Sequence, residues 1–323
     1  MRRLIWHRLV QLPLVLLAVY TLTFTLAWLV PGSPLEKPEG RRPPPEVQAA
    51  MAERYNLDDP WTFYWSYLER ASGVAWVTGE TSGPIFDFGP SLRHENWSVN
   101  EILAGQLPVS MALGLAAIVI AVLLGVSTGI LGGLRPGTTL DLVTQGLSVV
   151  GVSIPAFVVG TVLLLAGGVW TGWFPVGGWG DLAHMVLPAT ALSLPFAAYI
   201  ARLTRSGVLD EMHSDYVRTA RAKGLPERVV VLRHVLPNAL LPVLSYLGPA
   251  TAAAMTGSFV IEKVFAIPGL GMHFVDAVLG KDLTMIMGVV LVYATILVLM
   301  NLMVDVLHAW LDPRVRQAGV AHG

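Results

Sequence analysis

The residues best suited to chemistry lie in one short basic stretch, "DYVRTARAKGLPERVVVLRHVLPN", residues 215–238. Arg218, Arg221 and Lys223 supply positive charge that can pair with carboxylates or with lipid phosphates. Tyr216 adds a hydroxyl group just before these cations, and Thr219 adds one between Arg218 and Arg221. Apolar blocks flank the stretch on both sides, so we expect it to bind a partner at a membrane surface.

The same stretch predicts a short helix. Asp215 is placed to cap its first turn, residues 216–223 are mostly good helix formers, and Gly224 suits the position just after a helix. Val217, Ala220 and Gly224 share one face of small residues, which would fit a groove on another protein. The alternative is that any cytoplasmic loop of a membrane protein carries positive charge.

Motifs for catalysis on this chain are missing from the sequence. There is no cysteine, which excludes disulfides and thiolate metal sites. Gly280-Lys281 lacks the upstream glycine and the hydroxyl residue of a phosphate-binding loop, and neither HExxH nor GxSxG occurs. We therefore expect no enzyme activity, no cofactor or metal, and no nucleic-acid partner.

Composition indicates an integral membrane protein. The chain has 323 residues, of which 54% are hydrophobic and 13% charged, against roughly 25% charged in soluble domains. Because lipid cannot satisfy an open backbone, the spans must be helices, and the predicted fold is all-α and polytopic. Six transmembrane helices are expected, at Leu9–Val30, Leu107–Leu134, Leu142–Trp170, a short and proline-interrupted His184–Ala201, Leu240–Ile261 and Met285–Trp310.

Arginine and lysine set the orientation. Residues 1–8 carry 3 of them and the loop 202–236 carries 7, whereas the short loops predicted outside carry 0 and 2. The positive-inside rule therefore places both termini in the cytoplasm. The first span could also be a secretory signal, but it is long and ends in "VPGSP", which favours an uncleaved anchor.

The predicted division has three parts. Residues 1–30 form the cytoplasmic N-terminus and first span, 31–100 an extracytoplasmic subdomain, and 101–323 a five-helix core containing the loop 202–236. Two roles stay open for the outer subdomain, a cap resting on the membrane interface or a docking surface. Both rest on its aromatic cluster, Trp61, Phe63, Tyr64, Trp65 and Tyr67.

Small and polar residues mark two spans. Gly125, Gly129 and Gly133 share one helix face, which suits close helix packing or, alternatively, a pore wall. The fifth span, which Pro242 and Pro249 should bend, also carries polar or small residues that could line a neutral channel or pack locally. These candidate pathway residues are Thr251, Thr256, Gly257 and Ser258. Near the end of the last span, Asp305 either pairs with an arginine of the cytoplasmic loop or relays protons.

The basic stretch resembles the cytoplasmic loop of binding-protein-dependent ABC importer permeases. Their pattern is Glu-Ala-Ala, three residues, Gly, nine residues, Ile-x-Leu-Pro. Here Arg218-Thr219-Ala220 stands in the place of the first triplet. Gly224 follows it at the required spacing of three residues, and His234-Val235-Leu236-Pro237 completes the pattern. Further segments are similar to the B-type permease of oligopeptide importers, among them "DFGPSLRHENWSVNEIL", "AAYIARLTRS", "TGSFVIEKVFAIPGLG" and "VDVLHAWLDPRVR".

The resemblance implies a type I ABC importer permease fold in the cytoplasmic membrane of a prokaryote. Residues 216–224 would be the coupling helix, which seats on a cytoplasmic ATPase subunit with Ala220 and Gly224 permitting close approach. The implied partners are a second homologous permease chain, two ATPases that bind ATP and Mg²⁺, an extracytoplasmic peptide-binding protein, and peptide as substrate. Arg218, Thr219 and His234 depart from the pattern, where Glu, Ala and Ile are the family's residues.

Other functions remain open. Dipeptides, nickel or glutathione are alternative substrates within the same family. A secondary transporter acting without an ATPase is a different class, which would need intramembrane carboxylates or a repeated pair of broken helices, and no convincing repeat is seen. A membrane-anchored interaction protein built on the aromatic outer segment would not require five further spans.

Overall fold

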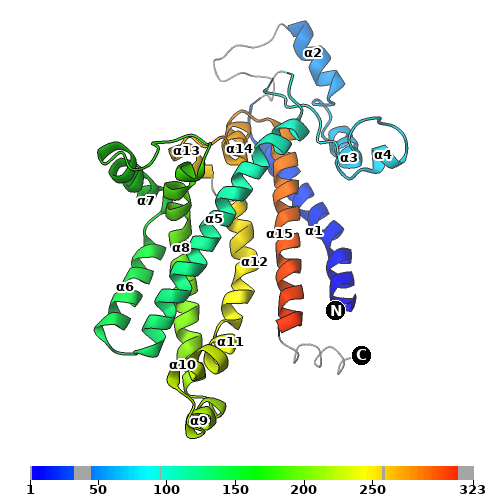
Figure 1. Cartoon of the computed structure of the whole chain (residues 1–323). Coiled ribbons are helices and arrows are strands. Elements are labelled where there is room, and N and C mark those ends of the chain that lie inside the picture. The colour runs from blue at the N-terminus through cyan, green and yellow to red at the C-terminus, as the bar shows by residue number, and fades with distance from the viewer. Residues whose placement is uncertain (1, 33–44, 95, 257–258, 312–323) are drawn as a thin grey trace. The chain divides into compact units, whose positions relative to one another are not determined.

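The computed structural model describes residues 2–32, 45–94, 96–256 and 259–311. These residues form helices and contain no named strand. The helices are α1 Arg2–Leu29, α2 Pro45–Arg54, α3 Pro60–Ala71, α4 Val74–Val77, α5 Val99–Leu134, α6 Thr139–Ser153, α7 Ala156–Leu163, the π-helix η1 Leu164–Trp170, α8 Leu182–Met212, α9 Asp215–Ala222, α10 Glu227–Val230, the π-helix η2 Val231–Val235, α11 Leu236–Ala239, α12 Leu241–Thr256, α13 Phe259–Val264, α14 Leu270–Leu279 and α15 Leu283–Leu311 (Figure 1).

The all-α prediction is confirmed, and four of the six expected spans are single apolar helices. These lie at Val10–Leu29, Val99–Leu134, Leu182–Met212 and Leu283–Leu307. The other two are bent pairs of helices, α6 with α7 and η1, and the α10–α11 segment with α12 and α13. There are six spans if each bent pair of helices crosses the membrane as one span.

The prediction that the third span is a single helix is wrong. The axis turns by 101° between Thr139–Ser153 and Ala156–Trp170. Pro155 explains the turn, because a residue before proline avoids the helical region, and Ile154 has φ −87° and ψ 125°. The run of apolar residues continues through the bend, so hydropathy alone does not reveal it.

The fourth span is longer than predicted. Helix α8 runs unbroken for 31 residues, although Pro188 and Pro195 lie inside it. Proline removes only one backbone donor, and neighbouring helices stabilise such positions in membrane proteins. Asp181 starts the helix with a capping box, accepting backbone hydrogen bonds from Ala183 and His184.

Contacts divide the chain into two compact units. The first comprises Met1–Arg8, Met111–Ile267 and Leu297–Gly323, and the second Leu9–Ser110 and Pro268–Ile296. The division of the sequence into an anchor, an outer subdomain and a five-helix core remains a prediction.

In the first unit, α5 packs against α8 through its glycines. A Cβ atom added at Gly129 would lie 2.5 Å from the Cβ of Thr204, and one at Gly125 would lie 2.6 Å from the carbonyl oxygen of Ala197. Gly133 approaches Val208 in the same way. The three glycines therefore form a packing face, as in other small-residue helix contacts, and not a pore wall.

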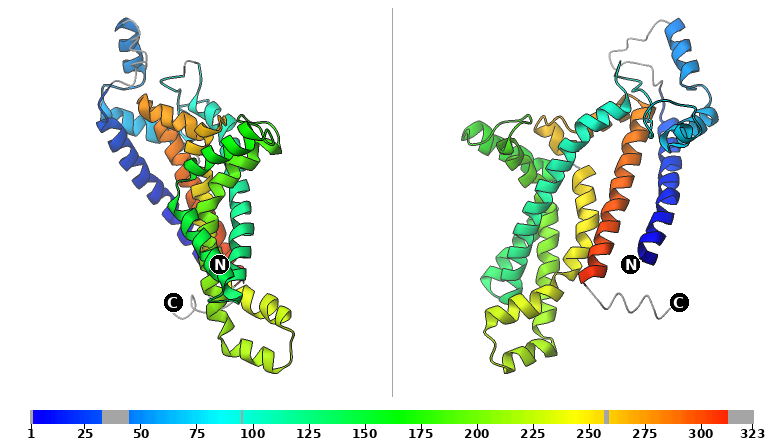
Figure 2. Two further views of the ribbon diagram at one scale, coloured as in Figure 1. Left: turned by 90° about the vertical axis from the view of Figure 1, so that its left-hand side faces the viewer. Right: turned by 45° about the vertical axis from the view of Figure 1, so that its right-hand side comes forward.

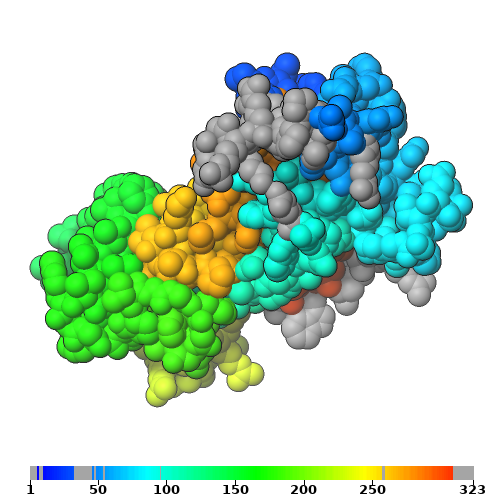
Figure 3. Space-filling view, turned by 90° about the horizontal axis from the view of Figure 1, so that it is seen from above, coloured from blue at the N-terminus to red at the C-terminus, as the bar shows by residue number. Residues whose placement is uncertain are grey.

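In the same unit, α7 packs beside α13. A Cβ atom at Gly160 would lie 3.2 Å from Ile261, and the Gly178 amide donates to the carbonyl of Phe265 across 2.9 Å. Figure 3 shows the green segment that contains α7 beside the yellow-orange segment of α13. The bend at Pro155 thus places α7 where it covers α13.

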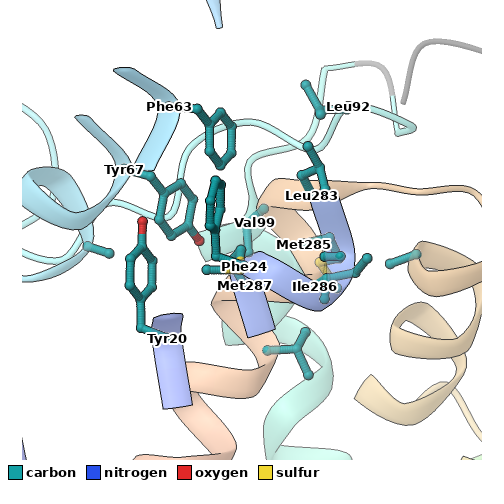
Figure 4. Packing of buried hydrophobic residues seen from close by; sticks show 14 of the residues in the cluster. Tyr20, Phe24, Phe63, Tyr67, Leu92, Val99, Leu283, Met285, Ile286 and Met287 are labelled. Carbon is teal, nitrogen blue, oxygen red and sulfur yellow. The ribbon is translucent and has the colours of Figure 1, made fainter. Parts of the chain in front are cut away.

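The core of the second unit is aromatic and joins α1 to α3 (Figure 4). The Tyr20 hydroxyl donates to the Tyr64 carbonyl across 2.6 Å, and Phe24 stacks on Phe63 with 6.1 Å between ring centroids. Tyr67 is fully buried and donates to the carbonyl of Thr284 on α15. Three members of the predicted aromatic cluster are therefore core residues, whereas Trp61 and Trp65 remain exposed.

Candidate functional site

Helix α9 occupies the predicted segment but starts one residue earlier than expected. Ser214 is the N-cap residue, with extended dihedral angles, and Asp215 is the first helical residue. The expectation that Asp215 caps the helix is therefore wrong. Its carboxylate still lies in the first turn, where negative charge stabilises the helix.

Gly224 ends α9 as predicted. Its φ is +74°, a conformation that glycine adopts without strain. The Gly224 amide donates to the Arg221 carbonyl across 2.9 Å, and the Leu225 amide donates to the Ala220 carbonyl across 3.3 Å. These two bonds form a Schellman motif, which fixes the direction in which the chain leaves the helix.

The small-residue face of α9 points into its own unit. Val217 and Ala220 are buried, and they pack with Val208 of α8 and with Val230 and Val235 of the following segment. The prediction of one bare face shared by Val217, Ala220 and Gly224 is therefore wrong for the first two. Ala220 seats α9 on its own chain, because its small side chain lets the helix approach that apolar cluster.

The opposite face of α9 is exposed and basic. It consists of Tyr216, Arg218, Thr219, Arg221, Lys223 and Gly224. Arg221 donates to both carboxylate oxygens of Glu227, with a shortest distance of 2.6 Å, and this hydrogen bond raises the pKa of Arg221. Arg218 lies 3.7 Å from Asp215, and both side chains are largely exposed, so that pair is weak. Arg218 is therefore easily released to a partner, whereas Arg221 also stabilises the loop.

Tyr216 ties α9 to two other helices. Its hydroxyl donates to the carboxylate of Glu211 at the end of α8, and Asn238 of α11 donates to the same hydroxyl across 3.0 Å. Burial and the hydrogen bond to Glu211 raise the pKa of Tyr216, which keeps the phenol protonated as a donor. One hydroxyl therefore connects α9 with both α8 and α11.

Helices α8 and α11 are in close contact next to this network. A Cβ atom at Gly207 would lie 2.3 Å from the carbonyl oxygen of Ala239. Figures 1 and 2 show α9 and α10 beyond the end of α8, with α11 returning along it. The segment is therefore closely packed against α8 through α11.

A buried ion pair joins α6 to α8 in the same unit. Arg205 donates to both oxygens of the Asp141 carboxylate, at 2.6 Å from Nε and 2.9 Å from Nη2. The Gly137 amide and the Gln145 side chain donate to the same carboxylate. Asp141 is almost fully buried, so all of these donors are needed to offset its loss of hydration.

The comparisons with known proteins identify the family. The profile described as "binding-protein-dependent transport system inner membrane component" matches residues 121–317. The chain belongs to this family. It is therefore an inner membrane component that works with other subunits of a transport system.

Relatives of this permease cover more than nine-tenths of its length. It is 42% identical over 320 residues to the oligopeptide transport system permease protein OppB of Escherichia coli strain K12, covering 98% of this chain and 100% of that protein. It is 41% identical over 301 residues to the dipeptide transport system permease protein DppB of Bacillus subtilis strain 168, covering 93% and 94%. These relatives are permeases by name, not catalytic subunits.

The fold of the permease is that of solved ABC importers. An inward-facing structure of the MetNI methionine ABC transporter aligns with a TM-score of 0.56 and 22% identity, covering 66% of this chain and 97% of the matched chain. The likeness supports the type I importer permease fold predicted from the sequence.

Two of the candidate pathway residues, Thr251 and Thr256, lie in the described part of α12. Thr251 is buried within the first unit, and the Thr256 hydroxyl donates to the Ala252 carbonyl across 2.8 Å. Gly257 and Ser258 lie outside the described residues. The burial of Thr251 and the hydrogen bond of Thr256 match the packing alternative, and the pathway role of all four remains a prediction.

Sequence reasoning missed Asp141, Arg205, Glu211 and Asn238. Asp141 has no role in the predictions from the sequence, and its partner lies 64 residues away in sequence. The one local signal is Thr138, which caps α6 and so predicts that Asp141 stands in a first helical turn. Among the described residues, no group of three or more His, Cys, Asp or Glu side chains could hold a metal ion.

Proposed function

We propose that the chain is a permease subunit of an ATP-driven importer that moves oligopeptides across the cytoplasmic membrane. The observation that carries the proposal is the full-length similarity to an oligopeptide permease, 42% over 98% of the chain. The similarity includes the α9 region, whose exposed basic face and packed inner face suit a contact with a separate motor subunit.

The proposed assembly contains a second homologous permease chain, two cytoplasmic ATPases and an extracytoplasmic peptide-binding protein. ATP and Mg²⁺ bind to the ATPases, and this chain carries no cofactor. Both termini lie in the cytoplasm in this arrangement, because the arginine-rich segments at 1–8 and 202–236 are then inside. ATPase activity of the purified chain alone would contradict the assignment of hydrolysis to the partners.

Helix α9 is the proposed coupling helix. The contacts with the ATPase fall on Tyr216, Arg218, Thr219, Arg221, Lys223 and Gly224, whereas Ala220 supports the helix from behind. Closing of the ATPases moves α9, and Tyr216 passes the motion to α8 through Glu211 and to α11 through Asn238. The inward-facing cavity then turns outward to receive peptide, and hydrolysis resets it.

Peptide passes beside the fifth span in this scheme, near Thr251, Thr256, Gly257 and Ser258. Hydroxyl groups and bare glycine backbone would offer hydrogen bonds to a peptide backbone without selecting side chains. Selection would then rest with the external binding protein. Asp305 serves a structural role in this scheme, because ATP and not a proton gradient supplies the energy.

Uptake by the complex reconstituted in vesicles tests the proposal. We expect ATP-dependent uptake of labelled longer peptides in the presence of the binding protein. Dipeptide is the second candidate, favoured by the 41% identity to a dipeptide permease, and nickel and glutathione are further arms of the assay. Uptake driven by a proton gradient without any ATPase would instead show a secondary transporter.

A further inference from the structure

A cleft in the second unit lies between α1, α14 and α15, three helices that Figure 1 labels. Its volume is about 310 Å³, and its walls are almost entirely apolar. Helix α1 contributes Leu26, Val30 follows the end of α1, and α14 contributes Phe274 and Val278. Leu26, Val30 and Val278 are also exposed, so the cleft opens to the surroundings of the helices.

The cleft lies at the ends of two candidate membrane spans. The span of α1 ends at Leu29, and the span of α15 starts at Leu283. Val290 on α15 also lines the cleft, seven residues into that span, which corresponds to roughly 10 Å along a helix. The cleft therefore extends from the edge of the hydrocarbon layer into it, where its surroundings are lipid and not water.

Lys281 provides the single charged side chain in the wall of the cleft. Its ammonium group donates to the carbonyl of Val30 across 2.5 Å and to that of Gly32 across 2.9 Å, just beyond the end of α1. An ammonium has three donors, and these two bonds use two of them. The charge therefore stays at the rim, next to the headgroup level of the bilayer.

We propose that this cleft binds a phospholipid, with one acyl chain between the three helices and the lipid phosphate at Lys281. The apolar wall matches an acyl chain, because the two surfaces can pack in van der Waals contact within the bilayer. The cation matches the phosphate, whose position at the membrane edge is that of the ammonium group. Such a lipid fastens the outer end of α1 to α14 and α15. The proposal requires only membrane insertion and does not depend on which solute is transported.

Native mass spectrometry of the full chain, released from nanodiscs of phosphatidylethanolamine and phosphatidylglycerol, tests the site. We expect one phospholipid retained per chain. Val278→Trp and Leu26→Trp fill the cleft from two helices, and each should lower retention about tenfold. Lys281→Gln keeps donors for the two carbonyls but removes the charge, and it should lower retention roughly tenfold as well.

Leu22→Trp is the matched control, because Leu22 is an exposed residue of α1 outside the cleft. Retention in this variant should equal that of the native chain, and all variants should elute as folded protein in size-exclusion chromatography. Equal retention in all four variants, or a native chain that carries no phospholipid, would overturn the proposal. Crosslinks from Val278 to a second permease chain in place of lipid would overturn it too.

Discussion

Asp141 and Arg205 hold α6 and α8 together through a two-pronged ion pair, with the Asp141 carboxylate 2.6 Å from the arginine Nε. The pair joins the start of the bent third span to the helix that carries α9. Its aspartate is buried, whereas its arginine is about one-quarter exposed. A pair in this position holds the start of α6 against α8 near the end of α8 that leads to α9.

We expect Asp141→Ala to destabilise the folded chain by on the order of 2 kcal/mol. Removing one partner of a fully buried ion pair destabilises a protein by about 3–5 kcal/mol. The loss expected here is smaller because Arg205 is partly hydrated. Thermal unfolding of the detergent-solubilised chain measures the loss. Asp215→Ala is the control, since it breaks an exposed pair and should change stability by less than about 0.5 kcal/mol. Equal effects of the two variants would contradict the importance of the buried pair.

Gly129→Ala should disrupt the contact of α5 with α8. The new Cβ atom would lie 2.5 Å from Thr204 Cβ and 2.6 Å from the Ala201 carbonyl oxygen, and neither can move without shifting α8. We expect a loss of about 2 kcal/mol, the usual cost of overpacking. Gly105→Ala in the same helix has open space around it, and it should stabilise the chain by up to about 1 kcal/mol. Stability that changes in the same direction in both variants would argue against close helix packing at Gly129.

Gly224→Val should loosen the end of α9. The obstacle is backbone conformation and not crowding, because φ is +74° while no atom lies within 4 Å of an added Cβ. A β-branched residue in this conformation costs on the order of 1–3 kcal/mol. We expect normal membrane insertion and ATP turnover but less peptide taken up per ATP in the reconstituted complex. Gly224→Asn is the control, since asparagine tolerates this conformation, and unaltered uptake by the valine variant would refute the coupling role.

Tyr216→Phe removes one hydroxyl and keeps the ring. The change deletes the bonds to Glu211 and Asn238, with a cost of about 1 kcal/mol in stability. We expect uptake per ATP to fall while binding of the ATPase, measured by co-purification, stays unchanged. Thr161→Ala is the comparison, because the Thr161 hydroxyl donates to the Phe157 carbonyl within α7 and lies outside the proposed ATPase contact. If the two variants transport equally well, α9 passes motion to the spans by another route.

Local patterns in the sequence were sufficient for much of the fold. The apolar runs predicted four spans that are single helices, and the glycine at position 224 marked the end of α9. The spacing of Gly125, Gly129 and Gly133 predicted one packing face, which lies against α8. These features depend on residues that are close together in the sequence. Local composition and the spacing of residues along a helix are therefore enough to predict them.

Other features depended on partners far away in the chain. Nothing in the sequence near Ala220 says whether its face is bare or buried, and the structure packs it against the valines that follow. The same holds for Arg205, whose role depends on a carboxylate 64 residues earlier. Ion pairing and burial depend on which residues come close together in the folded chain. Residues near each other in the sequence do not reveal this.

The sequence by itself determined the class of this protein, a helical membrane permease with a basic loop helix, because hydropathy, charge and short motifs act over single turns of helix. Only the tertiary structure decided which face of α9 is free, how the third span bends, and how Tyr216 reaches α8 and α11. Those outcomes follow from how segments distant in the chain pack together. The free energy of such contacts belongs to the pair of segments and not to either one alone.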